Sequence, residues 1–571
     1  MIRAFRARGR YAFELVGTSE GTTASRRAER GAAGGHRARR AAGRLPAGWP
    51  WIGAAVVALA SLGFGAKALA EYEWDRVVDF RSAFRFDLSP AEPTPPLADR
   101  LVVVVIDGLR LDVARDLPTL TTLGEAGSFL VARTGEPSLS FPGWTTLVTG
   151  APPEVSGVTT NSYEGPVLVD GLFASARRAG LTTAIAGSEG WRQLFGADVD
   201  VGFYVPDADD DSDPVVGRHA VQILEEDEPA FLLVHLVDVD HAGHEAGVGD
   251  EYRATAARAD RIVASIVEAA GDDAAVVVTS DHGHIDEGGH GGSEDDVTFV
   301  PVVLAGEGFT TGASGEIAQS DIAPTLAAVL GVGRPAHAIG TLRLGLLNAV
   351  EEDLAIIQAA QDEAGSGFFS RATEALGGEG ETAAALSDVR RERARHDLLA
   401  RLPFVLLATL ALAAGVALAT QRLDGPAMAI GVLVFVGLLV ALFFSRGSTL
   451  SFSQFDSDEQ VRSFLTGRFL DALIAAAGAG IVTGLTAGRR GWSGSFQAGL
   501  GTAAWAMLVL GLGVAAFVTI FGWGYTWRLP NLPAAFAQYL SLLSMFAAGI
   551  AAAVIGLLSM GAAWAASRGR P

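Results

Sequence analysis

The stretch LVVVVIDG, residues 101–108, indicates how the central part of the chain folds, because six apolar residues end abruptly at an aspartate and a glycine. Three more short apolar runs follow, at residues 231–234, 275–278 and 300–304, with helix-favouring stretches such as residues 252–270 between them. Buried strands that alternate with helices are typical of an α/β domain with a largely parallel sheet flanked by helices. We expect such a domain over residues 99–345.

Polar residues follow three of these runs at the point where each ends. Asp107 comes directly after the first run, Asp240 and His244 follow the second, and Asp281 and His282 follow the third. Parallel sheets bind their ligands at the carboxyl ends of the strands. We therefore expect these side chains to meet at one edge of the sheet.

The same segment has the composition of a metal site, because six of the ten histidines of the chain lie within residues 235–290. Together with His290 the candidate ligands number six, which predicts two divalent metal ions instead of one. The chain has no cysteine, which excludes thiolate zinc sites, iron–sulfur clusters and disulfides. Oxygen and nitrogen ligands suit Zn²⁺ first, with Mn²⁺ as the alternative, and paired metals suit in-line phosphoryl displacement.

A candidate nucleophile is Ser140, which precedes a Pro-Gly turn and the helix-like residues 144–149. This placement predicts a hydroxyl that faces the N-terminus of a helix, where anions bind. A metal ion could lower the pKa of that hydroxyl without a neighbouring general base.

Six short motifs, taken in order, resemble the alkaline phosphatase superfamily. The resemblance is to the branch of type I phosphodiesterases and nucleotide pyrophosphatases together with the GPI ethanolamine phosphate transferases. It covers residues 99–345, and six ordered motifs are far more specific than any one of them. The motifs are VIDGLR (105–110), SFP (140–142) followed by TG (149–150), DHAGH (240–244), SDHGH (280–284), GHG (289–291) and DIAPTL (321–326).

The resemblance assigns a role to each candidate residue. It implies that one metal ion is bound by Asp240, His244 and His290, and that Ser140 is the nucleophile beside the other ion. The ligands of that second ion would be Asp107, Asp281 and His282. Segment GSEGWRQLF (187–195) also looks like a segment of the GPI ethanolamine phosphate transferases.

The chain departs from the family pattern after the Phe-Pro pair, where Gly143 and Trp144 replace the Asn-His that its phosphodiesterases commonly carry. Gly143 is therefore a weak candidate for contacting the substrate. Asn161 is a substitute donor to the phosphate, although asparagine is also common in turns and we favour the turn.

Other polar residues near the motifs match no ligand position. His235, His241 and His284 are interpreted as groups that support the ligands or lie on the surface. The acidic run at residues 207–213 could bind Ca²⁺, but it lacks the glycine and closing glutamate of a calcium loop, so we favour a solvated loop.

Apolar segments at residues 51–70, 402–420, 426–444, 469–487, 496–521 and 536–563 predict one N-terminal and five C-terminal transmembrane helices. The apolar share of 49% and the mean hydropathy of +0.31 agree with a membrane protein. Arg422, the pair Arg489 and Arg490, and the pair Arg568 and Arg570 would all lie on the side of the Arg-rich N-terminus. The positive-inside rule then places both termini in the cytoplasm and the α/β domain outside the cell membrane.

The domain organisation follows from these segments. We expect a basic disordered tail (1–48), a transmembrane helix (51–70), a linker (71–98), the α/β domain (99–345), a helical stalk (346–400) and a five-helix transmembrane domain (401–566). Because the net charge is −21 and the basic residues concentrate in the tail, nucleic acid is not an expected partner.

The predicted function is that of a membrane-anchored, two-metal phosphodiester-cleaving enzyme with a seryl-phosphoenzyme intermediate. A single helix suffices for anchoring, so the helical domain favours a lipid-linked substrate and a phosphoethanolamine-type transferase or hydrolase. A nucleotide pyrophosphatase for soluble substrates is the main alternative, and a sulfatase or a non-enzymatic scaffold are minor ones. Aromatic residues of the outer loops could line a headgroup path, although an interfacial belt is the simpler interpretation; these are Phe452, Phe455, Phe464, Trp523, Tyr525 and Trp527.

Overall fold

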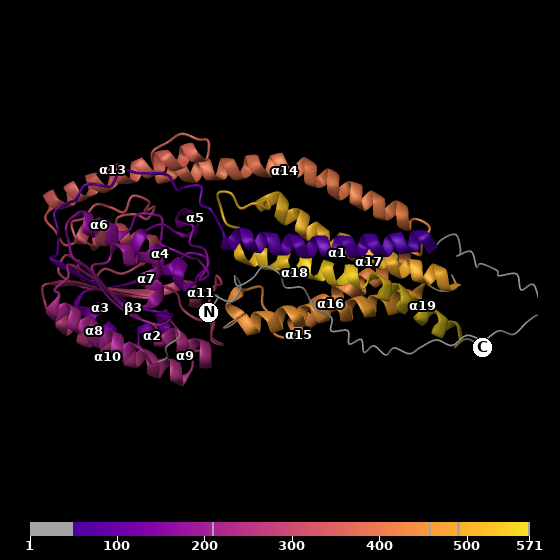
Figure 1. Cartoon of the computed structure of the whole chain (residues 1–571), viewed down its shortest axis with the longest axis horizontal. Helices are drawn as coiled ribbons and strands as arrows, with labels where there is room; N and C mark the ends of the chain where they lie inside the picture. The colour runs from indigo at the N-terminus through magenta and orange to yellow at the C-terminus, as the bar shows by residue number, and fades with distance from the viewer. Residues whose placement is uncertain (1–48, 208–210, 456–457, 488–490, 569–571) are drawn as a thin grey trace, which may run out of the picture.

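The computed structural model describes residues 49–207, 211–455, 458–487 and 491–568. The α/β domain lies at one end of a long helical bundle, and helices α13 and α14 run along one side of both (Figure 1). The predicted basic tail at residues 1–48, the arginines at 489 and 490, and Arg570 lie outside the described residues.

A mixed sheet of eight strands forms the centre of the α/β domain, in the order β4-β3-β5-β1-β6-β7-β2-β8. The five strands from β4 to β6 are parallel, whereas β7 is antiparallel to both of its neighbours. The prediction of an α/β fold with a largely parallel sheet is thus confirmed, although the fourth predicted strand runs in the opposite direction. The strands are β1 (Arg100–Ile106), β2 (Ser128–Arg133), β3 (Thr183–Ser188), β4 (Val201–Val205), β5 (Phe231–Leu236), β6 (Ala274–Thr279), β7 (Phe299–Gly306) and β8 (Glu316–Ala318).

Strand β1 is apolar throughout because both of its faces are covered. Val102, Val104 and Ile106 point to one face, and the alternate residues Leu101, Val103 and Val105 point to the other. Each fully buried side chain of this size contributes about 1.5–3 kcal/mol. On the first face lie α2 (Leu111–Ala114), α3 (Pro118–Ala126), α8 (Asp213–Glu226) and α10 (Asp250–Ala270). On the second lie α4 (Ser140–Thr149), α6 (Leu172–Arg178), α7 (Glu189–Phe195) and α12 (Ile322–Val329).

Three short helices lie in the connections of the domain: α5 (Pro153–Ser156), α9 (Asp238–Ala246) and α11 (Asp295–Thr298). Helix α9 directly follows β5, so it starts at the carboxyl edge of the sheet. This edge faces the bundle, as the position of α9 and α11 shows (Figure 1).

The bundle contains the six helices of the described chain that are long and apolar enough to cross a membrane, and the chain is a multi-pass membrane protein. One of them precedes the α/β domain and five follow it. They are α1 (Trp49–Val78), α14 (Ala383–Thr420), α15 (Gly425–Ser445), α16 (Asp458–Thr486), α17 (Gly491–Phe521) and α18 (Leu532–Ile550). A shorter apolar helix, α19 (Ala552–Arg568), follows α18, so the predicted segment 536–563 is broken near Ala551.

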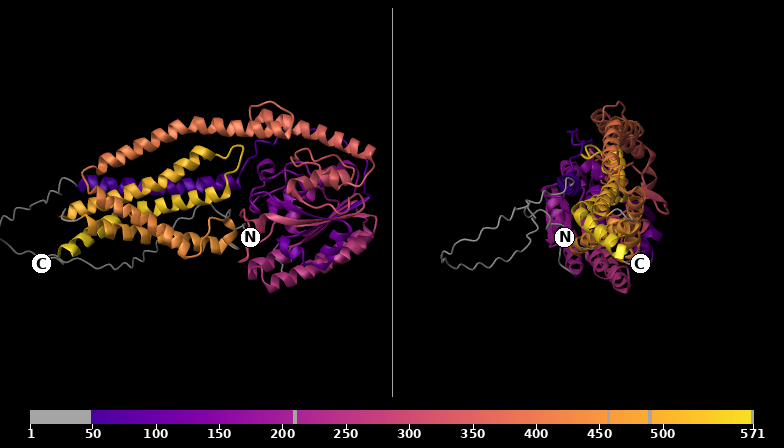
Figure 2. Two further views of the ribbon diagram at one scale, coloured as in Figure 1. Left: turned by 180° about the vertical axis from the view of Figure 1, so that it is seen from behind. Right: turned by 90° about the vertical axis from the view of Figure 1, so that its right-hand side faces the viewer.

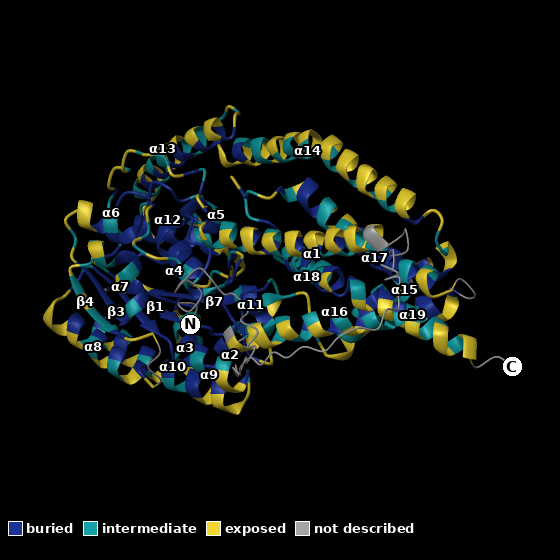
Figure 3. Cartoon of the chain, turned by 45° about the vertical axis from the view of Figure 1, so that its right-hand side comes forward, coloured by how far each residue is buried: buried dark blue, intermediate teal, exposed yellow. Residues whose placement is uncertain are grey.

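The predicted stalk consists of α13 (Glu351–Ala375) and the first half of α14. Helix α14 continues without a break from the stalk into the first C-terminal span, so no structural boundary lies at residue 400. No residue in the most apolar stretch of α14 is buried, and Figure 3 shows exposed residues along this helix. The other helices pack side by side, as the two further views show (Figure 2).

Glycines allow the close approach of helices inside the bundle. A Cβ atom at Gly549 would lie 2.6 Å from the Leu59 carbonyl oxygen, and one at Gly484 would lie 2.2 Å from that of Ser559. Small residues at helix contacts are typical of membrane proteins, where close packing replaces the hydrophobic effect. Contacts of this kind join α1 to α18 and α16 to α19.

Candidate active site

Most of the candidate ligands lie at the carboxyl edge of the neighbouring strands β5, β1 and β6. Asp107 directly follows β1, and Asp281 and His282 lie just beyond the end of β6. Helix α9 carries Asp240 and His244, which share one face because they are four residues apart. The parallel register of the three strands brings these segments to the same place.

The first cluster contains Asp107, Asp281 and His282, all of them buried. The His282 Nε2 atom lies 3.3 Å from Asp107 Oδ1 and 3.4 Å from Asp281 Oδ2. Neither of these two oxygens has a hydrogen-bond partner within the described residues. The other ring nitrogen of His282, Nδ1, donates to the Gly283 carbonyl oxygen at 3.2 Å, so Nε2 carries a lone pair. Three acceptor atoms therefore converge, which fits a cation.

The second cluster contains Asp240, His244 and His290. His244 Nε2 lies 3.4 Å from Asp240 Oδ2 and 3.1 Å from His290 Nε2. His290 Nδ1 donates to the Ser138 carbonyl oxygen at 2.9 Å, which turns the Nε2 lone pair toward the cluster. The rings of His282 and His290 stack with centroids 3.6 Å apart, so the two clusters adjoin. The structure thus brings together all six predicted ligands as the two predicted triads.

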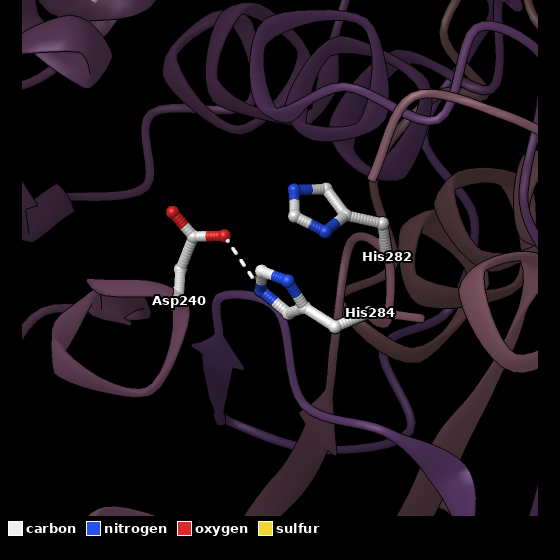
Figure 4. Close-up of side chains that lie close together, drawn as sticks. All are labelled: Asp240, His282 and His284. Atoms are coloured by element: carbon white, nitrogen blue, oxygen red, sulfur yellow. Dashed lines mark hydrogen bonds and ion pairs between the residues drawn. The ribbon is translucent and has the colours of Figure 1, made fainter. Parts of the chain in front are cut away.

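A third group of possible ligands joins the two clusters. Asp240, His282 and His284 also have ligand atoms within 4.8 Å of one another, and Figure 4 shows the three side chains. His284 Nε2 lies 3.0 Å from Asp240 Oδ1, at hydrogen-bond distance. A histidine that holds a ligating carboxylate in place is common around metal ions. His284 is buried and contacts a candidate ligand, as one of the two sequence interpretations expected.

The electrostatics of the clusters favour divalent cations. Burial, together with Asp281 and Asp240, raises the pKa of Asp107 well above its usual range, and burial beside Asp240 raises the pKa of Asp281 to about 7. Burial lowers the pKa of His282 to about 3, so this ring is neutral. Burial also opposes the ionisation of Asp240, but the neighbouring histidines keep the pKa of Asp240 well below its usual range. Metal ions bind carboxyl groups in their deprotonated form and imidazole rings in their neutral form.

Ser140 lies beside the first cluster, at the first residue of α4. Its Oγ atom is 3.5 Å from His282 Nε2, and the side chain is almost completely buried. The N-terminus of a helix favours negative charge, because its first N–H groups have no partner within the helix. The hydroxyl therefore lies beside the first cluster, at a helix N-terminus that favours an anion.

The structure places the two weaker candidates differently. Asn161 lies next to Ser140, with its Nδ2 atom 3.5 Å from Ser140 Oγ and its Oδ1 atom accepting a hydrogen bond from the Phe141 N–H at 3.0 Å. The backbone N–H of Gly143 donates to the Leu139 carbonyl oxygen inside α4. A Cβ atom at Gly143 would lie 3.1 Å from the Asp281 Cβ, so this glycine lets α4 pack closely against a ligand.

Two residues support Asp107: His235, as one of its two sequence interpretations expected, and Trp144, which was not predicted in that role. His235 Nε2 lies 2.8 Å from Asp107 Oδ2, and Trp144 Nε1 donates to the same oxygen at 3.2 Å. Trp144 in turn stacks on Trp191, with ring centroids 4.9 Å apart. The departure of Trp144 from the family pattern and the histidine at the end of an apolar strand were the signals that could have indicated this network.

The start of α9 is held by buried carboxylates. Asp213 Oδ1 accepts hydrogen bonds from the Val237 and Asp238 N–H groups at 2.7 and 3.2 Å, while Asp238 Oδ1 accepts one from the Ser212 N–H. Burial beside Asp238 raises the pKa of Asp213 to about 8. The interpretation of residues 207–213 as a solvated loop is therefore wrong for Asp213; residues 208–210 lie outside the described residues.

The loop that carries His290 is bonded directly to the bundle. Ser453, in the loop between α15 and α16, accepts a hydrogen bond from the Gly292 N–H at 2.9 Å and donates to Glu294 Oε2 at 2.8 Å. On the other side, Ser138 Oγ donates to the Gly292 carbonyl oxygen and accepts from the Gly291 N–H. Gly291 and Gly292 thus connect the loop of His290, in the second cluster, to Ser453 of the membrane domain.

The packing around Gly292 leads to a prediction. A Cβ atom there would lie 2.2 Å from Ser451 Oγ and 2.4 Å from Ser453 Oγ, so Gly292→Ala forces these hydroxyl groups or the loop that carries His290 to move and disturbs the hydrogen bond from Gly292 to Ser453. We expect metal affinity to fall by about 10-fold or more, which is the usual cost of disturbing the support of a ligand. Metal titration of the purified protein measures this. Gly249→Ala is the matched control, because a Cβ atom there meets nothing within 4 Å. Equal affinities in the two variants would contradict the coupling.

Comparison with known proteins agrees with the motifs. Residues 101–291 match the family "Type I phosphodiesterase / nucleotide pyrophosphatase". The human GPI ethanolamine phosphate transferase 2, catalytic subunit, is 28% identical over 274 residues, which cover 43% of this chain and 28% of that protein. The mouse GPI ethanolamine phosphate transferase 1 is 29% identical over 313 residues, which cover 45% of this chain and 34% of that protein. The chain thus spans about a third of the length of these relatives.

Two solved structures each align with 44% of the chain. Murine ectonucleotide pyrophosphatase/phosphodiesterase 5 aligns with a TM-score of 0.38 and 13% identity, over 44% of this chain and 100% of that chain. The alkaline phosphatase PafA aligns with a TM-score of 0.37 and 11% identity, over the same shares. The resemblance predicted from the motifs is confirmed by the family match and the curated relatives: residues 101–291 match the type I phosphodiesterase / nucleotide pyrophosphatase family, and the chain is similar over part of its length to the GPI ethanolamine phosphate transferases.

Proposed function

We propose that this protein is a membrane-anchored enzyme that cleaves phosphodiesters through Ser140 and uses two divalent metal ions. The observation that carries the proposal is the convergence of two ligand triads beside one hydroxyl at the N-terminus of a helix. The triads are Asp107, Asp281 and His282, and Asp240, His244 and His290. The absence of cysteine and the mixture of carboxylates with imidazoles favour Zn²⁺, with Mn²⁺ as the alternative.

The chemistry divides into two displacements at one phosphorus atom. Divalent cations bound at the two triads would stabilise the phosphoryl oxygens and lower the pKa of the Ser140 hydroxyl. Ser140 Oγ attacks phosphorus, the bond to the leaving alcohol breaks, and the leaving oxygen takes up a proton. The group that remains on Ser140 is then attacked by water or by an acceptor alcohol, and Ser140 Oγ leaves. The helix N-terminus at Ser140 stabilises the negative charge in both steps.

We infer that the substrate is carried by a lipid and that the transferred group is of the phosphoethanolamine type. The support is the bond between Gly292 and Ser453, which holds the site against the membrane domain, together with the names of the relatives. An anchored site meets a lipid at a raised effective concentration, whereas a freely diffusing nucleotide gains nothing from the bundle.

One experiment tests this substrate class. The purified full-length protein in lipid is incubated with labelled phosphatidylethanolamine, a nucleotide diester and a soluble aryl phosphodiester, and the label is followed. We expect the lipid to be turned over faster than the nucleotide. Preference for the nucleotide would instead support a nucleotide pyrophosphatase. Release of free phosphoethanolamine indicates hydrolysis, and labelled glycan or lipid acceptors indicate transfer.

We propose that the α/β domain lies outside the cell membrane and that both termini lie in the cytoplasm. Arg422 follows the end of α14, and Arg568 is the last residue of α19. Both helices end on the side of the bundle that is remote from the α/β domain (Figure 1), which agrees with the positive-inside rule. Because the chain has no cysteine, single cysteines are unambiguous probes. A Ser89→Cys variant is expected to react with an impermeant thiol reagent in intact cells, and Ser567→Cys only after permeabilisation. The reverse pattern would overturn the orientation.

A further inference from the structure

A cavity of about 510 Å³ lies between the end of α1 and the loop formed by residues 157–168. Its walls contain three arginines, Arg76, Arg81 and Arg85, and the apolar side chains of Phe80 and Leu168. Two carboxylates, of Asp79 and Glu164, also line it. Guanidinium groups thus outnumber carboxylates around this cavity.

Two of the arginines, Arg76 and Arg85, donate hydrogen bonds to backbone carbonyl groups. Nε and Nη2 of Arg76 both donate to the Gly524 carbonyl oxygen, at 3.2 and 3.0 Å. A Cβ atom on Gly157 would lie 2.3 Å from Arg85 Nη2, so the lack of a side chain at residue 157 makes room for the Arg85 guanidinium group. Arg81 is exposed. Among the residues that the structure describes, none of the three forms an ion pair with a carboxylate. Such groups are suited to binding an anion.

The position of the cavity relates it to both the membrane and the nucleophile. Arg76 lies in the last turn of α1, the first candidate membrane span. The loop on the other side is tied to that helix, because Thr159 Oγ1 donates to the Val77 carbonyl oxygen at 2.5 Å. In the same loop Asn161 contacts Ser140, and the next residue, Ser162, lines the cavity. A molecule bound there would therefore lie at the membrane surface and close to the reacting centre.

We propose that this cavity binds a phosphate group of a lipid headgroup, distinct from the phosphate that reacts at Ser140. This rests on the proposed function, of which it specifies the substrate: a lipid that carries a phosphate of its own beside the reacting centre. Arginine side chains match the oxygens of phosphate, as they do those of carboxylate, with two parallel N–H donors, and the position beside the end of a candidate membrane span favours the phosphate of a lipid. Leu168, which is exposed, supplies an apolar surface for the acyl end of the lipid.

The test measures binding in full-length Ser140→Ala protein, so that turnover does not interfere. The probe is dioctanoyl phosphatidic acid, and the variants are Arg81→Gln alone and Arg81→Gln with Arg85→Gln. We expect the affinity to fall at least about tenfold in the double variant, since each charge-assisted hydrogen bond to phosphate contributes about that factor. Arg261→Gln, an exposed arginine on α10, is the matched control and should leave the affinity unchanged.

The single variant keeps the test decisive if loss of Arg85 disturbs the fold, because Arg81 is exposed and an affinity decrease of a few-fold is expected from it alone. Affinity that is equal in the control and both arginine variants would overturn the proposal. Inorganic phosphate is titrated in parallel, and binding of phosphate without binding of the lipid would overturn the lipid assignment. Cleavage of a soluble aryl phosphodiester by the wild-type protein tests the proposed function separately, so the two failures are distinguishable.

Discussion

Replacing Ser140 with alanine is expected to reduce cleavage of a soluble aryl phosphodiester by at least about 10³-fold, the order of loss when a catalytic nucleophile is removed. The hydroxyl lies 3.5 Å from His282 Nε2, at the start of α4 and at hydrogen-bond distance from Asn161 Nδ2. Alanine removes the attacking atom but none of the six ligand side chains. Steady-state kinetics with the aryl substrate, together with metal analysis of the same sample, measure both consequences.

Two further variants make this result specific. Ser140→Thr keeps a hydroxyl group on the Cβ atom and should therefore retain part of the activity. Asn161→Ala removes the side chain that bonds to the Phe141 N–H, and we expect a smaller loss than from Ser140→Ala. Full activity in a Ser140→Ala protein with normal metal content would show that another group attacks phosphorus.

The arrangement of the ligands could be predicted because it depends on strand order and on little else. Asp107 and Asp281 each follow an apolar run, and parallel strands place their carboxyl ends at one edge. The direction of β7 could not be predicted in the same way. Its residues are as apolar as those of its neighbours, and burial on both faces gives the same pattern in parallel and antiparallel strands.

Contacts between residues far apart in the chain were the part that sequence patterns did not contain. Trp144 was noticed as a departure from the family pattern, but its hydrogen bond to Asp107 depends on the packing of α4 against the sheet. The bond from Gly292 to Ser453 joins two domains over 161 positions. No local periodicity encodes such a contact.

The outer-loop aromatics show the same limit. An interfacial belt is the wrong interpretation for Tyr525 and Trp527, which are buried; the Trp527 Nε1 atom donates to Asp397 at 3.1 Å. Trp523 remains exposed, as a belt residue would be. Phe452, Phe455 and Phe464 pack around Phe536 of α18, close to the loop of Ser453. Amino-acid type alone does not distinguish a ring that faces lipid from one that joins two domains.

The hydrogen bond between Gly292 and Ser453 connects the membrane domain to the loop that carries a candidate metal ligand. His290 is two residues from Gly292, and its ring is fixed by the Ser138 carbonyl oxygen. A shift of the loop between α15 and α16 would therefore reach a candidate metal ligand through a few bonds. The Gly292–Ser453 contact and the arginine cavity both bring parts of the membrane domain or its first helix close to the candidate active site.

Removal of divalent metal ions by a chelator is expected to abolish activity and to lower the unfolding temperature of the α/β domain. Without cations, buried Asp107 and Asp281 face each other and Asp240, so burial and mutual repulsion disfavour the charged forms of Asp107 and Asp281. A ligand at about 1,000 times its Kd stabilises the native state by about 4 kcal/mol, which corresponds to on the order of 10 °C for a domain of this size. Thermal unfolding with and without added Zn²⁺ or Mn²⁺ measures the shift.

The increase in unfolding temperature that metal ions cause should be larger at higher pH, because the carboxyl groups of the clusters must be deprotonated to bind them. The pKa of Asp281 is raised to about 7, and that of Asp107 is raised well above its usual range. The metal-free fold is therefore more stable when these groups are protonated, and it loses stability as the pH rises toward 7. Metal ions bind the deprotonated form, so protons compete with them below that pH. The gain in unfolding temperature on adding metal should therefore be larger at pH 8 than at pH 5.5. His244→Ala should reduce this gain, whereas His396→Ala, on the exposed surface of α14, should not. Equal gains at both pH values and in both variants would show that the metal ions bind elsewhere.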